Sequence, residues 1–272
     1  MSGAPAVRRL PARRAALVVG TAALAWAAAQ AVTTFTVKRD DAELVISNRA
    51  LASEGARTIG NNANCEPGQR MTIVYGPPPG HVETRVEDAV LTSPLALVRT
   101  PLDAEEGTGL ETLELLGAAV TFNRPGCIEE STPIEEPSVT LVQGRTRVVG
   151  SRFFLDREEN VGTMDGPIAL TREPAAEGEE PLTATASSMT FAVDEQRATL
   201  QGDVRVTSDE RTTTGESLTL DEEAGTAVLT GSPARSVRGA DVLEGARLLY
   251  YLDSDDVVVI GNVAGELEVE LE

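Results

Sequence analysis

In the C-terminal half of the chain, apolar and polar residues alternate in a pattern that recurs at a fixed interval. Each copy has an alternating apolar run that ends in Asp, a short polar stretch, and a second apolar run that ends in Gly. Four copies begin at Ser151, Ser187, Gly215 and Ala246, with Asp156, Asp194, Asp221 and Asp253 and with Gly166, Gly202, Gly231 and Gly261 at the matching places. The last three glycines are 29 and 30 residues apart. Such a period predicts stacked supersecondary units, none of which buries its apolar face alone.

The apolar positions of the repeat share one parity, so in extended strands they point to one face. Counted from the Asp and Gly positions, they are Phe153, Phe191, Leu218 and Tyr250; Leu155, Val193, Leu220 and Leu252; Met164, Leu200, Leu229 and Val259; and Ile168, Val204, Pro233 and Val263. Phe153, Phe191, Leu218 and Tyr250 are expected to form one column of side chains, with Leu200 and Leu229 in a facing column. The other parity is mostly polar, which predicts antiparallel β-hairpins stacked into one curved sheet. The Asp and Gly residues are interpreted as turn and bulge formers rather than catalytic groups.

Residues 32–149 show the same alternation more weakly and with longer interruptions. Strands are expected in Val32–Arg57, Val82–Arg99, Thr112–Phe122 and Val139–Val149. The Pro- and Gly-rich stretches Asn61–Gly80 and Arg124–Pro137 are expected to be loops, and 172–181 is expected to be a polar insertion. We therefore predict three segments: 1–31, a degenerate β-region at 32–149, and the β-repeat region at 150–272.

The first 31 residues have the composition of an export signal. Four arginines precede an Ala-rich apolar core, and Ala29-Gln30-Ala31 fits a small-x-small cleavage site, so cleavage after Ala31 is expected. The alternative is that the segment is retained as a membrane anchor, although its apolar run is shorter than the roughly 20 residues of a typical span.

Charge and chemistry exclude several classes of function. The chain has 23 basic and 43 acidic residues and a net charge of −20, which argues against nucleic-acid binding. The single histidine, His81, makes a metal centre or a histidine-based catalytic site improbable, and no nucleophile elbow, P-loop or dinucleotide fingerprint is present. The acidic run Asp253–Asp256 lacks the spacing of calcium loops. We expect no cofactor, no metal and no enzymatic activity.

Cys65 and Cys127 are the only two cysteines, and each lies in a predicted loop. If the chain is exported, the two are expected to form a disulfide, because that compartment is oxidising. Two free thiols are the alternative.

The repeat resembles the OstA-like domain of the LptA type, found in lipopolysaccharide-transport proteins. The resemblance rests on the line ATASSMTFAVDEQRATLQGDVRVT, and on Gly202–Val206 (GDVRV) and Gly261–Val263 (GNV). It is clear over about Ser151–Gly265 and weaker over Val32–Phe122. It implies an open, V-shaped β-jellyroll with an apolar groove for lipid acyl chains, and head-to-tail stacking through the periplasm between the inner and outer membranes. Whether the longer chain forms one groove or two tandem domains stays open.

The resemblance implies a periplasmic carrier or bridge for lipopolysaccharide or another acyl lipid, working with inner- and outer-membrane transport components. The groove would then be lined by Phe153, Leu155, Met164, Ile168, Phe191, Val193, Leu200, Val204, Leu218, Leu220, Leu229, Tyr250, Leu252, Val259 and Val263, for which ordinary core packing is the alternative. Other functions that stay open are a solid β-solenoid of the cell envelope that binds proteins by its sheet edges, the membrane-anchored partner of the same transport system and, last, a β-helical polysaccharide lyase.

In the last repeat, Leu249, Tyr251, Val258 and Ile260 occupy the parity that is polar elsewhere. An apolar patch of this kind predicts a surface covered by the first half of the chain or by another protein. The closing stretch Glu266–Glu272 alternates Glu with Leu or Val and is expected to be an edge strand.

Overall fold

The structure is a computed structural model that describes residues 33–39, 42–104, 111–134, 138–174, 181–192, 195, 197–208, 210–221, 223–252, 257–261 and 264–266. These belong to one compact unit, Ala31–Glu272. The predicted export signal at 1–31, with its cleavage site, lies outside the described residues. Among the described residues, no helix is long and apolar enough to cross a membrane.

The described chain is almost entirely antiparallel β-structure, so the predicted all-β fold of stacked hairpins is confirmed. The strands are β1 (Thr33–Arg39), β2 (Ala42–Asn48), β3 (Arg57–Asn62), β4 (Gln69–Tyr75), β5 (Val82–Val86), β6 (Ala89–Ser93), β7 (Leu95–Pro101), β8 (Thr112–Leu116), β9 (Ala118–Phe122), β10 (Ile128–Pro133), β11 (Val139–Gln143), β12 (Thr146–Gly150), β13 (Arg152–Asp156), β14 (Val161–Arg172), β15 (Leu182–Ala192), β16 (Arg197–Ser208), β17 (Arg211–Asp221), β18 (Thr226–Arg238), β19 (Asp241–Tyr251), β20 (Val257–Ile260) and β21 (Ala264–Glu266). A short 3₁₀ turn, η1 (Ala52–Glu54), follows β2.

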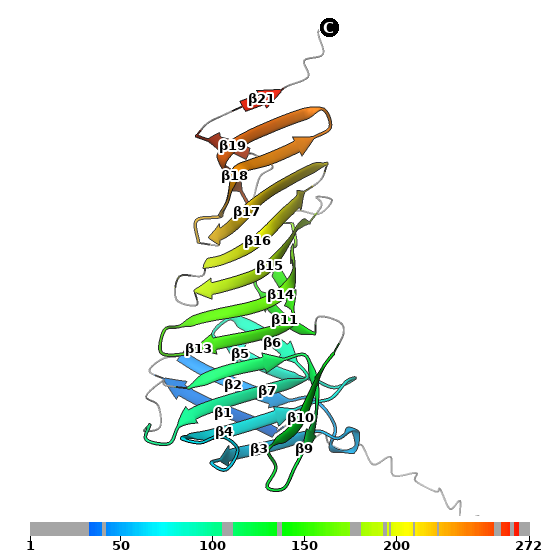
Figure 1. Cartoon of the computed structure of the whole chain (residues 1–272), viewed down its shortest axis with the longest axis vertical. Coiled ribbons are helices and arrows are strands. Elements are labelled where there is room, and N and C mark those ends of the chain that lie inside the picture. The colour runs from blue at the N-terminus through cyan, green and yellow to red at the C-terminus, as the bar shows by residue number, and fades with distance from the viewer. Residues whose placement is uncertain are drawn as a thin grey trace, which may run out of the picture. The chain divides into compact units, whose positions relative to one another are not determined.

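The main sheet is folded into two leaves that share the long strands β14–β19, which are stacked one above another in Figure 1. In the A leaf, pairing runs from β3 through β4, β7, β8 and β13 into the first half of β14, and it ends at β20. In the B leaf, pairing runs from β1 through β2, β5, β6, β11 and β12 into the second half of β14, and it ends at β21. Both leaves are continuous across residues 149 and 150. The predicted division of the chain into a region 32–149 and a region 150–272 stays a prediction.

The fold between the leaves coincides with the repeated glycines. The registers of the β14–β15 and β15–β16 pairs shift around Gly166 and Gly202, and the later pairs shift at the same level. Gly202 has a φ of +79°, and a Cβ there would lie 2.8 Å from the Ser187 hydroxyl oxygen. Only a residue without a side chain fits at Gly202, because its bulge combines a positive φ with a close approach, whereas in β15 the register shifts at Ala186 and Ser187 without a glycine.

Each leaf carries an unbroken ladder of paired residues on its inner face. The A-leaf ladder is Val74, Ala96, Leu115, Phe153, Met164, Met189, Leu200, Leu218, Leu229, Leu248 and Val259. The B-leaf ladder is Ile46, Thr84, Leu91, Leu141, Val148, Leu170, Ala184, Val206, Thr213, Ser236 and Leu243. Residues of both ladders pack into one hydrophobic cluster, which forms the interior between the leaves.

The predicted parity is correct in the repeat, but the predicted columns are wrong. Phe153 and Leu218 share the A-leaf ladder with Leu200 and Leu229, so no facing column separates them. Phe191 and Tyr250 lie in the adjacent ladder, two residues along, where they pair with Ala198 and Ala227. The cause is hairpin length, since β13 and β17 end on their Asp, whereas β15 ends two residues before Asp194 and β19 two residues before Asp253.

The prediction that Pro233 lies on the inner face is also wrong. Pro233 is exposed, and Ala234 lies on the inner face in its place with 0% exposure. The register of β18 and β19 shifts between Thr230 and Ala234, which moves the inner parity along by one residue. The position after the bend therefore cannot be found by counting a fixed distance from Gly231.

In the first half of the chain, two predicted loops contain strands. Asn61–Gly80 includes β4, whose residues Met71–Tyr75 are buried, because its two sides face different hydrophobic clusters. Arg124–Pro137 includes β10, which pairs with β9 in a separate two-stranded ribbon (Figure 1). Val120, Phe122 and Ile128 of this ribbon pack on the outward-facing side chains of β4 and β7.

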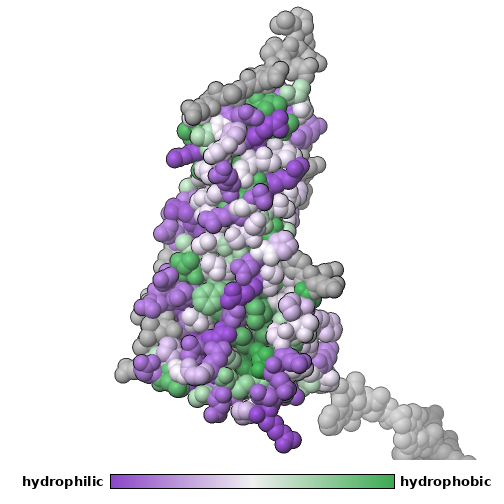
Figure 2. All heavy atoms as spheres, viewed as in Figure 1, coloured by the Kyte–Doolittle hydropathy of each residue, from purple (hydrophilic) through white to green (hydrophobic). Residues whose placement is uncertain are grey.

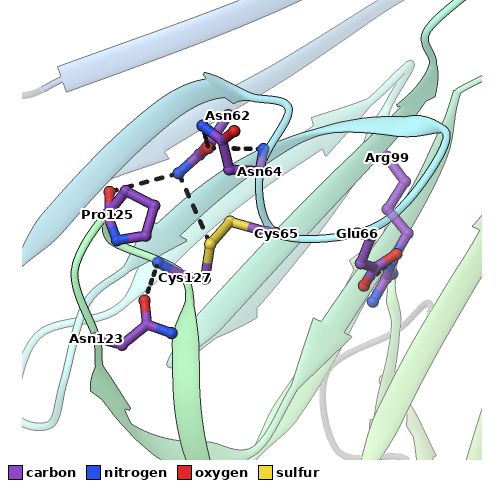
Figure 3. Close-up of a disulfide and its surroundings, with 8 residues drawn as sticks. All are labelled: Asn62, Asn64, Cys65, Glu66, Arg99, Asn123, Pro125 and Cys127. Atoms are coloured by element: carbon purple, nitrogen blue, oxygen red, sulfur yellow. Dashed lines mark hydrogen bonds and ion pairs between the residues drawn. A yellow bond between two sulfur atoms is a disulfide. The ribbon is translucent and has the colours of Figure 1, made fainter.

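The ribbon is attached to the sheet by a disulfide between Cys65 and Cys127 (Figure 3). The Asn62 side-chain amide donates to the Pro125 carbonyl at 3.5 Å and lies 3.8 Å from the Cys127 sulfur. The Cys127 backbone N–H donates to the Asn123 side chain at 3.0 Å. The outer face of the A leaf is thus covered at its β4–β7 end by the chain itself.

The opposite end of the A leaf has no such cover from the described residues. Tyr251, Val258 and Ile260 are 44%, 44% and 45% exposed. The described residues of the first half of the chain do not bury these three side chains, and cover by another protein stays a prediction. Leu249, the fourth residue of the predicted patch, is half-buried. The predicted edge strand Glu266–Glu272 lies outside the described residues from 267 onward, and β21 ends at Glu266.

Candidate functional site

The interior between the A and B leaves is the candidate site, because most of the residues predicted to face a ligand meet there. Phe153, Leu155, Met164, Ile168, Phe191, Leu200, Val204, Leu218, Leu220, Leu229 and Tyr250 are all buried. Leu252 and Val259 are partly buried and pack against the same cluster. Val193 and Val263 lie outside the described residues. Whether any of these side chains contacts a lipid stays a prediction.

Around Phe191, described side chains fill most of the space between the leaves. A cavity of about 20 Å³ lies between the leaves, with Val148 and Leu170 of the B leaf on one side and Met189, Phe191 and Leu220 of the A leaf on the other. A single water needs about 10 to 15 Å³ on this measure, so the space is far too small for an acyl chain. An acyl chain could enter only if the leaves or the side chains move apart.

Hydroxyl groups interrupt the apolar lining at two places, and the repeat pattern did not single them out. Thr84, in β5, is 0% exposed, and its hydroxyl has no hydrogen-bond partner among the described residues. Thr213 and Ser236, in β17 and β18, are each 1% exposed, and the Thr213 hydroxyl donates to Ser236 at 3.1 Å. The Tyr250 hydroxyl donates to Thr213, which joins the two leaves across the interior. The register shifts at the bends change the parity, so counting from the glycines does not place Ser236 on the inner face.

A network of short ion pairs around the buried residue Glu114 lies outside this interior. Glu114 lies in β8, which pairs with β7 and β13. Its carboxylate accepts hydrogen bonds from Arg152 at 2.6 Å and from Arg99 at 2.7 Å. Burial by itself raises the pKa of Glu114, but the hydrogen bonds from Arg152 and Arg99 outweigh it, so the pKa lies below its ordinary value. A carboxylate held ionised between two guanidinium groups is not poised to exchange protons near neutral pH.

Metal-binding groups do not converge in the described part of the chain, where no cluster of three or more His, Cys, Asp or Glu residues could hold an ion. The acidic run Asp253–Asp256 lies outside the described residues. The chemistry that the described interior offers is therefore burial of apolar groups, with hydroxyls at a few fixed positions.

Comparison with known proteins bears on residues 134–226, which match the family model described as LptA/(LptD N-terminal domain) LPS transport protein. Among solved structures, the chain is similar to LptH of Pseudomonas aeruginosa, described as the LptA homologous periplasmic component of the conserved lipopolysaccharide transport device. That similarity has 14% identity and a TM-score of 0.38, and covers 46% of this chain and 95% of LptH. No curated protein matches. The resemblance predicted from the repeat is confirmed over 134–226, from just before β11 to the start of β18.

Proposed function

We propose that this protein is an exported, non-enzymatic carrier in lipopolysaccharide transport, which shields lipid acyl chains between its two sheet leaves. The observation that supports the proposal best is the A-leaf ladder, which stays apolar from Val74 to Val259 and runs through the segment that matches the transport family. A carrier of this kind needs a long apolar path and no reacting groups.

The energetics of acyl burial support the same proposal. Removing one methylene from water is worth about 0.8 kcal/mol, so shielding a chain of about a dozen methylenes offsets on the order of 10 kcal/mol of exposure. A path whose apolarity is uniform along its length leaves a bound chain with little preference for any one position. Movement along the ladder would then meet only small barriers.

The filled interior sets a condition on this function. Since the cavity between Val148 and Phe191 holds no more than about one water, lipid must enter by displacing side chains or by parting the leaves. The proposed way in is the long side opposite the bend of β14–β19, where hydrogen bonds rather than backbone join the leaves. The hydrogen bond from Tyr250 to Thr213 would have to open as well.

The same filled interior favours one alternative, a structural envelope protein whose core is solid. In that case the sheet edges β1, β3, β20 and β21 would be the functional surfaces, through pairing with strands of other proteins. In the carrier, those same edges are proposed to join it head-to-tail to further copies, or to inner- and outer-membrane transport components. The proposed location is the periplasm, and a retained N-terminal segment would make the protein a membrane-anchored member of the same system.

The experiment that separates carrier from solid core is lipid extraction from protein purified from the cell envelope without detergent. Mass spectrometry of the extract is expected to find an acyl lipid at near-stoichiometric amount. A protein that is folded, carries no lipid and takes up none when incubated with purified lipopolysaccharide would contradict the carrier and favour the structural alternative.

A further inference from the structure

The two leaves differ in the polarity of their inner faces beyond β16. In the A leaf the ladder continues as Leu218, Leu229 and Leu248, whereas in the B leaf it changes from Val206 to Thr213 and Ser236. The hydroxyl-bearing residues are as deeply buried as the leucines. One end of the interior therefore has an apolar wall opposite a polar one, which suits an amphiphile better than a plain hydrocarbon chain.

A guanidinium group reaches this polar wall. Arg211 begins β17 on the same parity as Thr213, and its Nη1 donates to the Ser236 hydroxyl at 3.4 Å. The Nε atom of Arg211 is buried and has no hydrogen-bond partner among the described residues. A buried guanidinium N–H without an acceptor is costly, so its position indicates a missing acceptor.

Further charged residues lie beside Arg211 along the rim. Arg238, in β18, lies directly opposite Arg211 in the ladder, and Asp241 lies opposite Arg238 in β19. Like charges in directly opposed positions destabilise a sheet unless an opposite charge lies near. Asp241 and the exposed Glu210 in the preceding turn supply negative charge near these two arginines.

We propose that Arg211, Ser236 and Thr213 form a binding site for an oxyanion, such as the phosphate of an amphiphile whose acyl chains lie along the A-leaf ladder. Phosphate oxygens match the fork of guanidinium donors and also accept from hydroxyl groups. The anion would accept from the unpartnered Arg211 Nε–H and from the Ser236 hydroxyl, and also from the Thr213 hydroxyl once its O–H turns from Ser236 to the anion. This proposal adds the headgroup to the carrier function and rests on that function for the placing of the acyl chains.

The test compares three probes on the full-length protein: a dialkyl phosphate amphiphile, a neutral dialkylglycerol with the same chains, and inorganic phosphate. The unmutated protein is expected to bind the phosphate amphiphile at least about tenfold more tightly than the neutral one, a preference equivalent to about 1.4 kcal/mol. Arg211→Gln should abolish that preference and leave binding of the neutral amphiphile unchanged. The matched control is Arg205→Gln, which removes the same charge from an exposed position in β16 and should keep the preference.

Ser236→Ala provides a second variant should Arg211→Gln lower the melting temperature, and it is expected to weaken the preference in the same direction. Equal affinity for the two amphiphiles, or equal losses from Arg211→Gln and Arg205→Gln, would overturn the oxyanion site and leave the carrier intact. Conversely, inorganic phosphate that binds in an Arg211-dependent way, with no binding of either amphiphile, would support the oxyanion site and overturn the carrier. No binding of any probe would overturn both.

Discussion

Gly215 in β17 lies so close to β18 that a Cβ atom built on it would be 2.6 Å from the carbonyl oxygen of Thr230. The same Cβ would lie 2.9 Å from the Leu229 side chain. Gly215 is at the level where the β17 and β18 register shifts between Thr214 and Ser217. The fold between the two leaves thus depends on contact between backbones that no larger residue allows.

Replacing Gly215 with Ala should therefore destabilise the protein by about 2 kcal/mol, because backbone atoms cannot move aside as a flexible side chain can. The control is Gly60→Ala in β3, where a Cβ meets nothing within 4 Å. That change is expected to be neutral or slightly stabilising. Urea denaturation of both variants measures the difference, and equal midpoints would show that the bend tolerates a side chain.

The disulfide is expected to contribute strongly to the stability of the ribbon and the sheet beneath it. Cys65 and Cys127 are separated by 62 residues, and closing a loop of this length is worth about 4 kcal/mol in the chain-entropy model. Reduction should lower the melting temperature of the unmutated protein, and the double substitution Cys65→Ala, Cys127→Ala should make it insensitive to reductant. A melting temperature unchanged by reduction would contradict this.

Glu114 should make stability depend on pH in the acid range. Its pKa in the folded protein lies below the ordinary value of 4.5. Ionised Glu114 therefore stabilises the fold fully at pH values above the pKa that this residue has in the unfolded chain. The contribution is lost as the pH falls through the folded-state pKa. Because Arg152 is 43% exposed, solvent weakens the pair, and we expect Glu114→Gln to cost about 1 to 2 kcal/mol at pH 7.

The measurement is the free energy of unfolding of Glu114→Gln against pH, beside that of Glu130→Gln, an exposed residue of β10. The cost of Glu114→Gln should shrink as the pH is lowered past the range in which Glu114 titrates. A cost that is the same at pH 7 and in acid would assign the effect to packing rather than to charge.

The inner face of the repeat could be predicted from the sequence because period-2 patterning depends only on neighbouring residues. The predicted face of Leu200 and Leu218 is therefore correct. The predicted column of Phe191 and Tyr250 is wrong, because the pairing partner of each residue depends on hairpin length. Strand β4 was missed because its two sides pack against different clusters, which removes the alternation.

The polar end of the candidate site could not be predicted from the repeat. Thr213 and Ser236 are polar residues on an inner face, and their burial is explained by their hydrogen bond to each other and by the contacts with Tyr250 and Arg211. The pairing of β9 with β10 outside the main sheet is also a long-range result, since nothing local distinguishes Ala118–Phe122 from the strands that join the leaves.

A charge placed on the inner face should separate the carrier from a solid core. Phe191 is 5% exposed, so the carboxylate of Phe191→Asp must be desolvated unless the leaves part to admit water. For a carrier, we expect the fold to survive with a lowered melting temperature and binding of a fluorescent acyl lipid to be lost. For a solid core, unfolding is expected because burying the charge costs several kcal/mol.

Thr199→Asp is the matched control, because Thr199 has the opposite parity in β16 and bonds to Thr219 at 3.3 Å on the outer face. It should change neither melting temperature nor lipid binding by much. Equal damage from the two substitutions would contradict the assignment of inner and outer faces.

The most direct test of the carrier maps where a bound acyl chain lies. A lipid with a photoreactive group in its acyl chain is incubated with the unmutated protein, activated by light, and located by mass spectrometry of the digested chain. We expect adducts on inner-ladder residues, among them Met189, Leu200 and Leu218. Adducts confined to exposed residues such as Tyr251 and Val258, or none at saturating lipid, would contradict the claim that acyl chains bind between the leaves.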